Sequence, residues 1–357
     1  MPLMPPKNTY KTSGVFSGKK ISLNELVIFC RKVFYMLNAG LRIEEALLTL
    51  QKQKFSAGLN LAISQLYTGI LVGESLQASL QKTNFFPPFV AAYVAIGEET
   101  AELAQVFEKL ADYYEERAKT RKEVVSALVY PCTVMLMMLG VVVLAMVTVL
   151  PGYARIFEAS DITLPVITEY LMRLSAFFVR NGLVIFIITV AVILLTLLFA
   201  RSKEGANVLA VISLKIPILR KGINYNFAQA LSLMLNSGIL VSDAVPLCAN
   251  IMGNTVVKEN LYSAHALMVS GNDFSVAMKK MPYIDTMLTD LAQIGEETGE
   301  LPTLMKKCSE YIATDYKDSL KRLTKLIEPM LTIAMGVLLA LLMLAVVLPT
   351  FELATVM

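Results

Sequence analysis

The chain has 357 residues, enough for two domains, but 55% of them are hydrophobic and the mean hydropathy is +0.59. This composition excludes an ordinary soluble protein and indicates that part of the chain lies in lipid. A formal net charge of only +3 and the lack of tryptophan give no case for a nucleic-acid-binding surface, so we expect no direct contact with nucleic acid.

The first 120 residues are predicted to be an arm followed by a helical domain. Residues 1–20 are rich in Pro, Gly, Ser and Lys and contain no apolar core with a cleavage site, so we expect a flexible cytoplasmic arm and no signal peptide. Apolar residues then recur at spacings of three and four, with Gly and Pro between the periodic segments. Short helices are expected at 22–38, 42–54, 57–71, 75–82 and 88–96, and a long helix from about residue 101.

Three charge-free stretches follow, at 124–154, 181–200 and 329–351. Each is long enough to cross the hydrocarbon core of a bilayer, which takes about 20 helical residues. We predict transmembrane helices at 129–151, 181–200 and 329–351. Lys and Arg gather before the first and third stretches and after the second, so these flanks should be cytoplasmic. The segment 152–180 and the C-terminus should lie outside.

The second half of the chain repeats the first. "MLNAG" at 36–40 returns as "MLNSG" at 234–238, and "IGEET" at 96–100 returns at 294–298, both at an offset of 198 residues. The repeat predicts two homologous cytoplasmic helical bundles, at 21–123 and 219–325, each followed by a membrane span. The second span lies outside the repeat and returns the chain to the cytoplasm, which makes the repeats parallel.

The most similar part of the repeat is an acidic turn before each long helix. We expect Gly97 and Gly295 to mark the junction between the helices, and Thr100 and Thr298 to cap the long ones. Three interpretations of the carboxylates stay open: charge favoured at a helix N-terminus, a contact for a basic partner, or a site for a hard cation. The contact would use Glu98, Glu99, Glu102, Glu296, Glu297 and Glu300, and the metal candidates are Glu98, Glu102, Glu296 and Glu300.

Nothing in the chain indicates an enzyme. A single histidine, His265, excludes a two-His zinc site, and we expect it at the surface or in helix packing. No P-loop and no G-x-S-x-G motif occurs, so we expect no cofactor. No pair of cysteines is available for a disulfide in the expected outer loop, and all four should be reduced, buried small residues: Cys30, Cys132, Cys248 and Cys308.

The order of these motifs resembles a known family. A helical domain with "MLNAGLRIEEAL", a span opening after "YP", and a second domain with "LKIPILRK" and "IGEETGEL" are similar to the inner-membrane platform protein of type II secretion systems and type IV pili, the secretion-system F and pilus-assembly C type. The resemblance covers residues 22–351.

The resemblance implies an all-α membrane protein with two homologous cytoplasmic bundles of six helices each and three transmembrane helices. It also implies a non-enzymatic platform in the plasma or inner membrane of a bacterium or archaeon. The partners implied are a hexameric cytoplasmic assembly ATPase, pilin or pseudopilin subunits, other inner-membrane assembly proteins, the lipid bilayer, and further copies of the chain. Ala101 departs from the glycine usual in the acidic turn, so we expect the first copy to turn differently from the second.

A small-solute transporter or channel component built from a parallel duplicated repeat is the alternative. Three spans are few for enclosing a path, and the spans carry no ionisable group. Glu328 lies at the cytoplasmic edge of the third span, beside Pro329. Two interpretations of it stay open: a hydrated interfacial residue, or a polar contact for an incoming subunit helix.

Overall fold

A computed structural model describes residues 21–149, 151, 152 and 166–356, and within these ranges the secondary structure is helical, with no strand. The chain divides into two compact units, residues 1–118 and 119–357, and each is described by itself. The predicted arm at 1–20 and residues 153–165 of the predicted outer segment lie outside the described residues. The all-helical fold expected from the sequence is confirmed.

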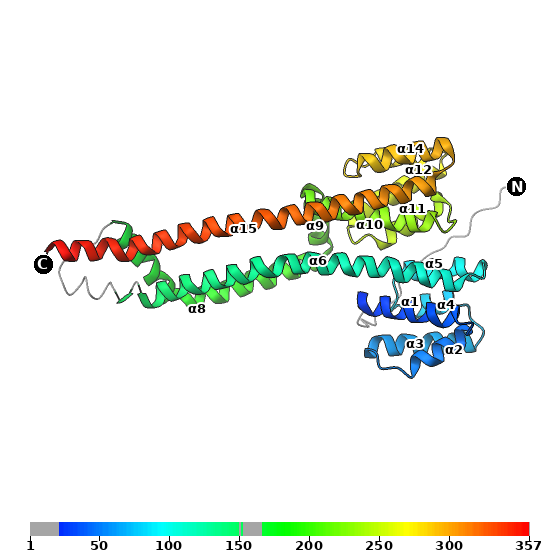
Figure 1. Ribbon diagram of the computed structural model, residues 1–357, viewed down its shortest axis with the longest axis horizontal. Helices are drawn as coiled ribbons and strands as arrows, with labels where there is room; N and C mark the ends of the chain where they lie inside the picture. Colours follow the sequence, from blue (N-terminus) through cyan, green and yellow to red (C-terminus); the bar gives the residue numbers. More distant parts are fainter. Residues whose placement is uncertain (1–20, 150, 153–165, 357) are drawn as a thin grey trace. The chain divides into compact units, whose positions relative to one another are not determined.

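The first unit holds the helices of the first copy (Figure 1). Five short helices precede the start of a sixth, long one, and these match the expected segments to within a few residues. Their bounds are α1 Leu23–Asn38, α2 Ile43–Gln51, α3 Ala57–Leu71, α4 Leu76–Thr83, α5 Pro88–Glu99 and α6 Leu103–Leu144.

Local signals explain where these helices begin and end. Ser22, Ser56 and Ser75 each accept a hydrogen bond from a backbone N–H of the helix that follows, which satisfies a donor left free in the first turn. Gly40 and Gly73 end α1 and α3 with φ angles of 87° and 83°, a region that glycine enters at little cost. The equivalent Gly238 and Gly271 have φ angles of 83° and 96°, so both copies turn alike at these points.

Aromatic rings from distant helices form the core of the first bundle. The ring of Phe29 in α1 lies 5.0 Å from that of Phe86 and 6.1 Å from that of Phe107 in α6. All three side chains are buried. At the edge of this core, Arg31 forms ion pairs with Asp112 at 2.7 Å and Glu115 at 2.5 Å, which join α1 to α6.

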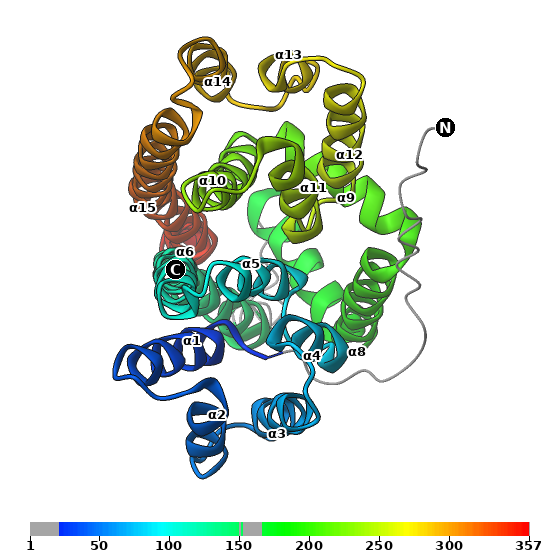
Figure 2. The same ribbon diagram turned by 90° about the vertical axis from the view of Figure 1, so that its right-hand side faces the viewer.

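The second unit holds the second bundle, also of six helices. Asn224, 3% exposed, links its elements by donating to the carbonyl of Tyr283 and accepting from the N–H of Asp285. In Figure 2, α13 and α14 lie side by side, as their contacts require. The helices are α10 Pro217–Leu235, α11 Val241–Ile251, α12 Thr255–Val269, α13 Phe274–Lys279, α14 Thr286–Thr298 and α15 Leu301–Val356.

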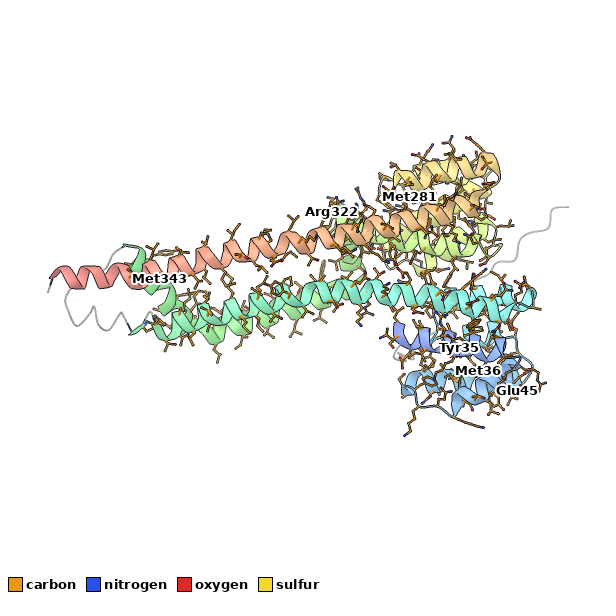
Figure 3. All side chains as sticks on the ribbon, viewed as in Figure 1. Tyr35, Met36, Glu45, Met281, Arg322 and Met343 are labelled. Atoms are coloured by element: carbon orange, nitrogen blue, oxygen red, sulfur yellow. The ribbon has the colours of Figure 1, made fainter. Side chains whose placement is uncertain are left out.

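Among the residues that the structure describes, three helices are long and apolar enough to cross a membrane, as predicted. They are the continuation of α6, the helix α8 Val166–Arg201, and the continuation of α15. Along α15 the side chains change from charged to apolar. In Figure 3, Arg322 lies near the bundle, and Met343 lies far along the apolar segment. The π-helical segment η1, Ala145–Val149, follows α6.

Two features between the spans were not expected. Residues 166–180, which were assigned to the outer segment, form the first turns of α8. The helix therefore begins well before the apolar stretch at 181–200, because a helix can form without an apolar composition. Residues 203–215, left between the second span and the second copy, form α9, Lys203–Lys215. Ser202 caps α9 through a hydrogen bond from Gly205 N–H. Local capping therefore starts a new helix there.

The cysteines give a testable consequence of this packing. Cys30, Cys248 and Cys308 are fully buried, whereas Cys132 is exposed on α6. Burial raises the pKa of the Cys30 and Cys308 thiols to about 12, and raises that of Cys248 as well. Because the thiolate is the reactive form, these three side chains should resist maleimide at pH 7.5 in the folded protein and react after unfolding in guanidinium chloride. Mass spectrometry of the labelled peptides checks this. Rapid native labelling at Cys248 would contradict it.

Candidate functional site: the acidic turn of each repeat

The acidic turn holds the end of α5 against the start of α4. Glu98 Oε1 and Oε2 accept hydrogen bonds from the backbone N–H groups of Leu76, at 2.6 Å, and Gln77, at 3.0 Å. These are the first two N–H groups of α4, which have no partner within their own helix. Glu98 is therefore a helix cap supplied from 22 residues further along the chain, and its negative charge lies at the favoured end of the helix dipole.

The second copy repeats this arrangement at equivalent positions. Glu296 accepts from the N–H groups of Phe274, at 2.6 Å, and Ser275, at 3.0 Å, the first two donors of α13. From the sequence, both carboxylates were expected near the N-terminus of a long helix. In the structure, Glu98 instead caps the start of α4 and Glu296 caps the start of α13.

Gly97 and Gly295 were expected to mark the junction between two helices. In the structure, neither glycine ends its helix. Gly97 lies inside α5, which continues to Glu99, and Gly295 lies inside α14, which continues to Thr298. A Cβ on Gly295 would lie 2.7 Å from Leu301 Cα, and one on Gly97 would lie 2.8 Å from Val106 Cγ2. Glycine is thus needed because the next helix folds back closely. The hydroxyls of Thr100 and Thr298 donate to Ile96 and Ile294 carbonyls, so neither caps the long helix.

The reversal itself occurs two residues before each long helix. Gly299 has φ 74° and Ala101 has φ 58°, both left-handed. In the first copy the N–H of Glu102 also donates to Gly97 O at 3.0 Å, a bond typical of a Schellman motif. The expectation that the alanine forces a different turn is therefore wrong. The first copy adopts the same left-handed conformation, and Ala101 carries the steric cost of it.

This cost predicts opposite effects of exchanging the two residues. Ala101→Gly should stabilise the first bundle, and Gly299→Ala should destabilise the second, each by about 1 kcal/mol, because Cβ approaches the following carbonyl in the left-handed region. Chemical denaturation of the purified variants in detergent measures both changes. If the two substitutions shift the midpoint in the same direction, the left-handed angle at residue 101 is not the cause.

The remaining carboxylates of the motif face solvent. Glu99, Glu102, Glu297 and Glu300 are exposed. The carbonyls of Glu102 and Glu300 accept the first backbone bonds of α6 and α15, so these two residues precede the long helices directly. Because each long helix continues from here into a span, the turn lies at the end of the helix farthest from its apolar segment. Asn236 Nδ2 donates to Pro302 O at 3.1 Å, which brings the end of α10 to the same place.

The cation interpretation gains no support from the geometry. Within residues 21–149, 151, 152 and 166–356, no group of three or more His, Cys, Asp or Glu side chains is placed to hold a metal ion. Glu98 and Glu296 already accept from backbone donors. Sequence reasoning missed that capping role. No local signal could have found it, because the N–H groups that Glu98 caps lie 22 and 21 residues earlier in the chain.

A second feature lies between the membrane segments of α6 and α15. Here an apolar groove of about 280 Å³ is lined by Thr133, Val134, Met137, Met138, Val141, Met335, Leu338 and Leu339. Two pairs of these residues, Met137 with Met335 and Val141 with Leu339, occupy equivalent positions of the repeat. Glu328 is exposed on α15, seven residues before Met335. This groove was not predicted, because an apolar stretch of sequence does not show which span packs against which.

Comparison with known proteins gives the same repeat and the same register. A family model described as type II secretion system (T2SS), protein F matches residues 29–151 and again 227–349. The type IV pilus assembly protein PilC of Thermus thermophilus is 26% identical over 335 residues, covering 92% of this chain and 82% of the relative. The type II secretion system protein F of Pseudomonas aeruginosa is 26% identical over 357 residues, covering 98% and 88%.

Proposed function

The chain belongs to the type II secretion system protein F family, and from this membership we propose that it is the membrane platform of a machine that assembles a pilus or a secretion pseudopilus. The family consists of non-enzymatic assembly platform proteins, so the work of assembly has to come from another component. We propose that a hexameric cytoplasmic ATPase supplies it. The bundles then pass its motion or docking energy to the spans, where pilin or pseudopilin subunits leave the bilayer.

The proposed topology places both bundles in the cytoplasm. It is supported by the Lys and Arg residues around the first and third spans, at 117–122 and 317–325, and by the lack of any basic residue after residue 351. The domain limits that go with it are an arm at 1–20, bundles at 21–123 and 219–325, spans at 129–151, 181–200 and 329–351, and an outer segment at 152–180.

The exposed carboxylates of the acidic turns are the proposed contact for the ATPase. The observation that carries this is their repetition: Glu99 and Glu102 in one copy, and Glu297 and Glu300 in the other, all face solvent at the end of a long helix away from its span. Capping accounts for Glu98 and Glu296, whereas the exposed acids do not cap α4 or α13, and Glu297 makes a surface hydrogen bond, accepted from Gln293 Nε2 at 3.0 Å. Two equal acidic sites suit a ring of ATPase subunits that each present a basic surface.

The groove between α6 and α15 is the proposed contact for the subunit helix. Its walls are apolar, and three of its eight lining residues are methionines, whose flexible side chains adapt to different partners. The exposed carboxylate of Glu328 would lie at the edge of the bilayer, where it can meet a polar or positive group of the entering subunit.

Complementation of a deletion strain tests the platform function and the acidic contact together. The variant carries Glu99→Lys, Glu102→Lys, Glu297→Lys and Glu300→Lys, and surface filaments and secreted protein are measured at matched membrane levels. Glu98 and Glu296 are left unchanged because their replacement would disturb α4 and α13. We expect loss of assembly with the bundles folded, whereas the control Glu259→Lys, at an exposed position outside the turns, should retain it.

Two other outcomes would overturn parts of this proposal. If the fourfold variant assembles filaments normally, the acidic turns are not the ATPase contact. If deletion leaves filaments and secretion intact but changes the uptake or efflux of a solute, the transporter alternative takes the place of the platform.

A further inference from the structure

A polar pocket opens between α3 and α4 of the first bundle, away from the acidic turn. Its volume is about 320 Å³, within the usual range for small-ligand sites. The lining has no aromatic and no aliphatic side chain, and consists of Ser64, Gln65, Thr68, Glu74, Ser79, Lys82 and Thr83.

The inner wall of the pocket holds a hydroxyl that lacks a partner. Ser79 is 2% exposed, and within the described chain its Oγ forms no hydrogen bond. A buried polar group left in this state costs about 1–3 kcal/mol. This hydroxyl packs directly against Gly69 of α3, where a Cβ would lie 2.3 Å from Ser79 Oγ.

Several groups around the pocket can accept hydrogen bonds. Thr68 and Thr83 donate their hydroxyl protons to the carbonyls of Ser64 and Leu80, which leaves lone pairs on both hydroxyl oxygens. Glu74 adds a carboxylate whose side chain is 29% exposed. Lys82, with a side chain 67% exposed, reaches across to pair with Glu74. The pocket thus already attracts one cation, held on a flexible surface side chain.

The second copy lacks this lining although it shares the fold. Ser64, Thr68, Ser79 and Thr83 correspond to Tyr262, Ala266, Ala277 and Met281, and Gly69 corresponds to Leu267. Glu74 corresponds to Asn272, so Lys280 has no equivalent carboxylate opposite it. The bundle therefore folds without a polar pocket at this place, and the lining of the first copy needs another explanation.

We propose that this pocket binds the guanidinium group of an arginine from a partner protein, in the place that the Lys82 ammonium occupies. A guanidinium presents five N–H donors in a planar fork and suits several fixed acceptors better than an ammonium does. Leu71 and Val72, 61% and 71% exposed, lie just before Glu74 and offer an apolar contact for the residues beside that arginine. The occupant is thus an arginine with apolar neighbours in a polypeptide.

Ligand-observed NMR titration of the full-length protein in detergent tests the chemistry. Acetyl-arginine amide should bind saturably, and its neutral isostere acetyl-citrulline amide should bind about tenfold more weakly or not at all, since only the first can pair with a carboxylate. Glu74→Gln should weaken binding of the arginine probe about tenfold. Lys82→Ala should strengthen it several-fold by removing the internal competitor, whereas Lys280→Ala in the second copy should change nothing.

A peptide probe distinguishes a partner protein from a free small cation. Acetyl-leucyl-arginyl-leucyl amide should bind more tightly than acetyl-arginine amide, and the double variant Leu71→Ser with Val72→Ser should remove this gain without affecting the smaller probe. If the peptide gains nothing, the ligand is a free guanidinium compound and the partner proposal fails. Equal binding of the arginine and citrulline probes, or weaker binding by Lys82→Ala, overturns the cation site itself. Binding is measured on the isolated protein, so its failure leaves the proposed platform function untouched.

Discussion

Replacing Glu296 by alanine is expected to lower the free energy of unfolding of the second bundle by about 2–3 kcal/mol, the usual range for hydrogen bonds to a charged group. Glu296 holds the N–H groups of Phe274 and Ser275, and the preceding Asp273 makes no side-chain cap bond of its own. Without the carboxylate, α13 has no side-chain cap, and a helix of only 6 residues cannot replace it internally.

Glu98→Ala in the first bundle should have a smaller effect in the same direction. Ser75 still accepts from Ala78 N–H there, so α4 keeps one of its caps. Guanidinium denaturation followed by circular dichroism measures both variants, with limited proteolysis locating the weakened bundle. The matched controls are Glu297→Ala and Glu99→Ala, the next residue in each copy, which should change stability by less than about 0.5 kcal/mol. If the controls cost as much as the capping residues, the effect comes from net charge and not from the cap.

The capping role has a consequence for the interpretation of the motif. A carboxylate that occurs at the same position in both copies invites a functional explanation, and the sequence analysis kept partner contact and cation binding open for it. The structure accounts for Glu98 and Glu296 through the fold alone. The acids beside them have no such explanation, so a partner contact is better sought at Glu99, Glu102, Glu297 and Glu300.

The parts of the fold that the sequence predicted depend on local or periodic information. Helices α1 to α5 follow from apolar spacing together with signals such as Ser22 and Gly40, and their observed limits agree closely. The repeat follows from a constant offset, which the family match reproduces. The spans follow from length and the absence of charge.

What the sequence did not predict depends on contacts between distant residues. The bond from Leu76 N–H to Glu98 joins residues 22 positions apart, and no local pattern distinguishes that carboxylate from Glu99 beside it. The pocket depends on polar side chains of two helices and on the close packing of Ser79 against Gly69. Comparison of the copies could have signalled it, because these positions become large or apolar in the second copy.

Gly97 and Gly295 show the same limit of local reasoning. Glycine followed by polar residues usually ends a helix, and that pattern predicted a break at these positions. The helices continue instead, and the glycines serve the close return of the next helix, with the left-handed residue placed four positions later.

Gly295→Ala should therefore destabilise the second bundle by about 2 kcal/mol, within the range for overpacking a close contact. The added Cβ would meet Leu301 Cα at 2.7 Å and Leu301 N at 3.2 Å, and these are backbone atoms that cannot rotate away. In the first bundle, the nearest atom to a Cβ on Gly97 is Val106 Cγ2 at 2.8 Å, part of a side chain that can adjust more readily. Gly97→Ala should accordingly cost about half as much.

The control for both variants is Gly140→Ala, another glycine inside a helix. Apart from the backbone of its own helix and its chain neighbours, no atom lies within 4 Å of a Cβ at that position, so alanine should be neutral or should stabilise the helix by up to about 1 kcal/mol. Denaturant midpoints of the three purified variants give the comparison. Equal losses at residues 97 and 295 would show that the loss of glycine flexibility matters more than the contact. A loss only at residue 295 would contradict the cost expected at residue 97, and would mean that the contacts there, with Val106 Cγ2 at 2.8 Å and Leu103 Cα at 3.2 Å, relax around the added Cβ.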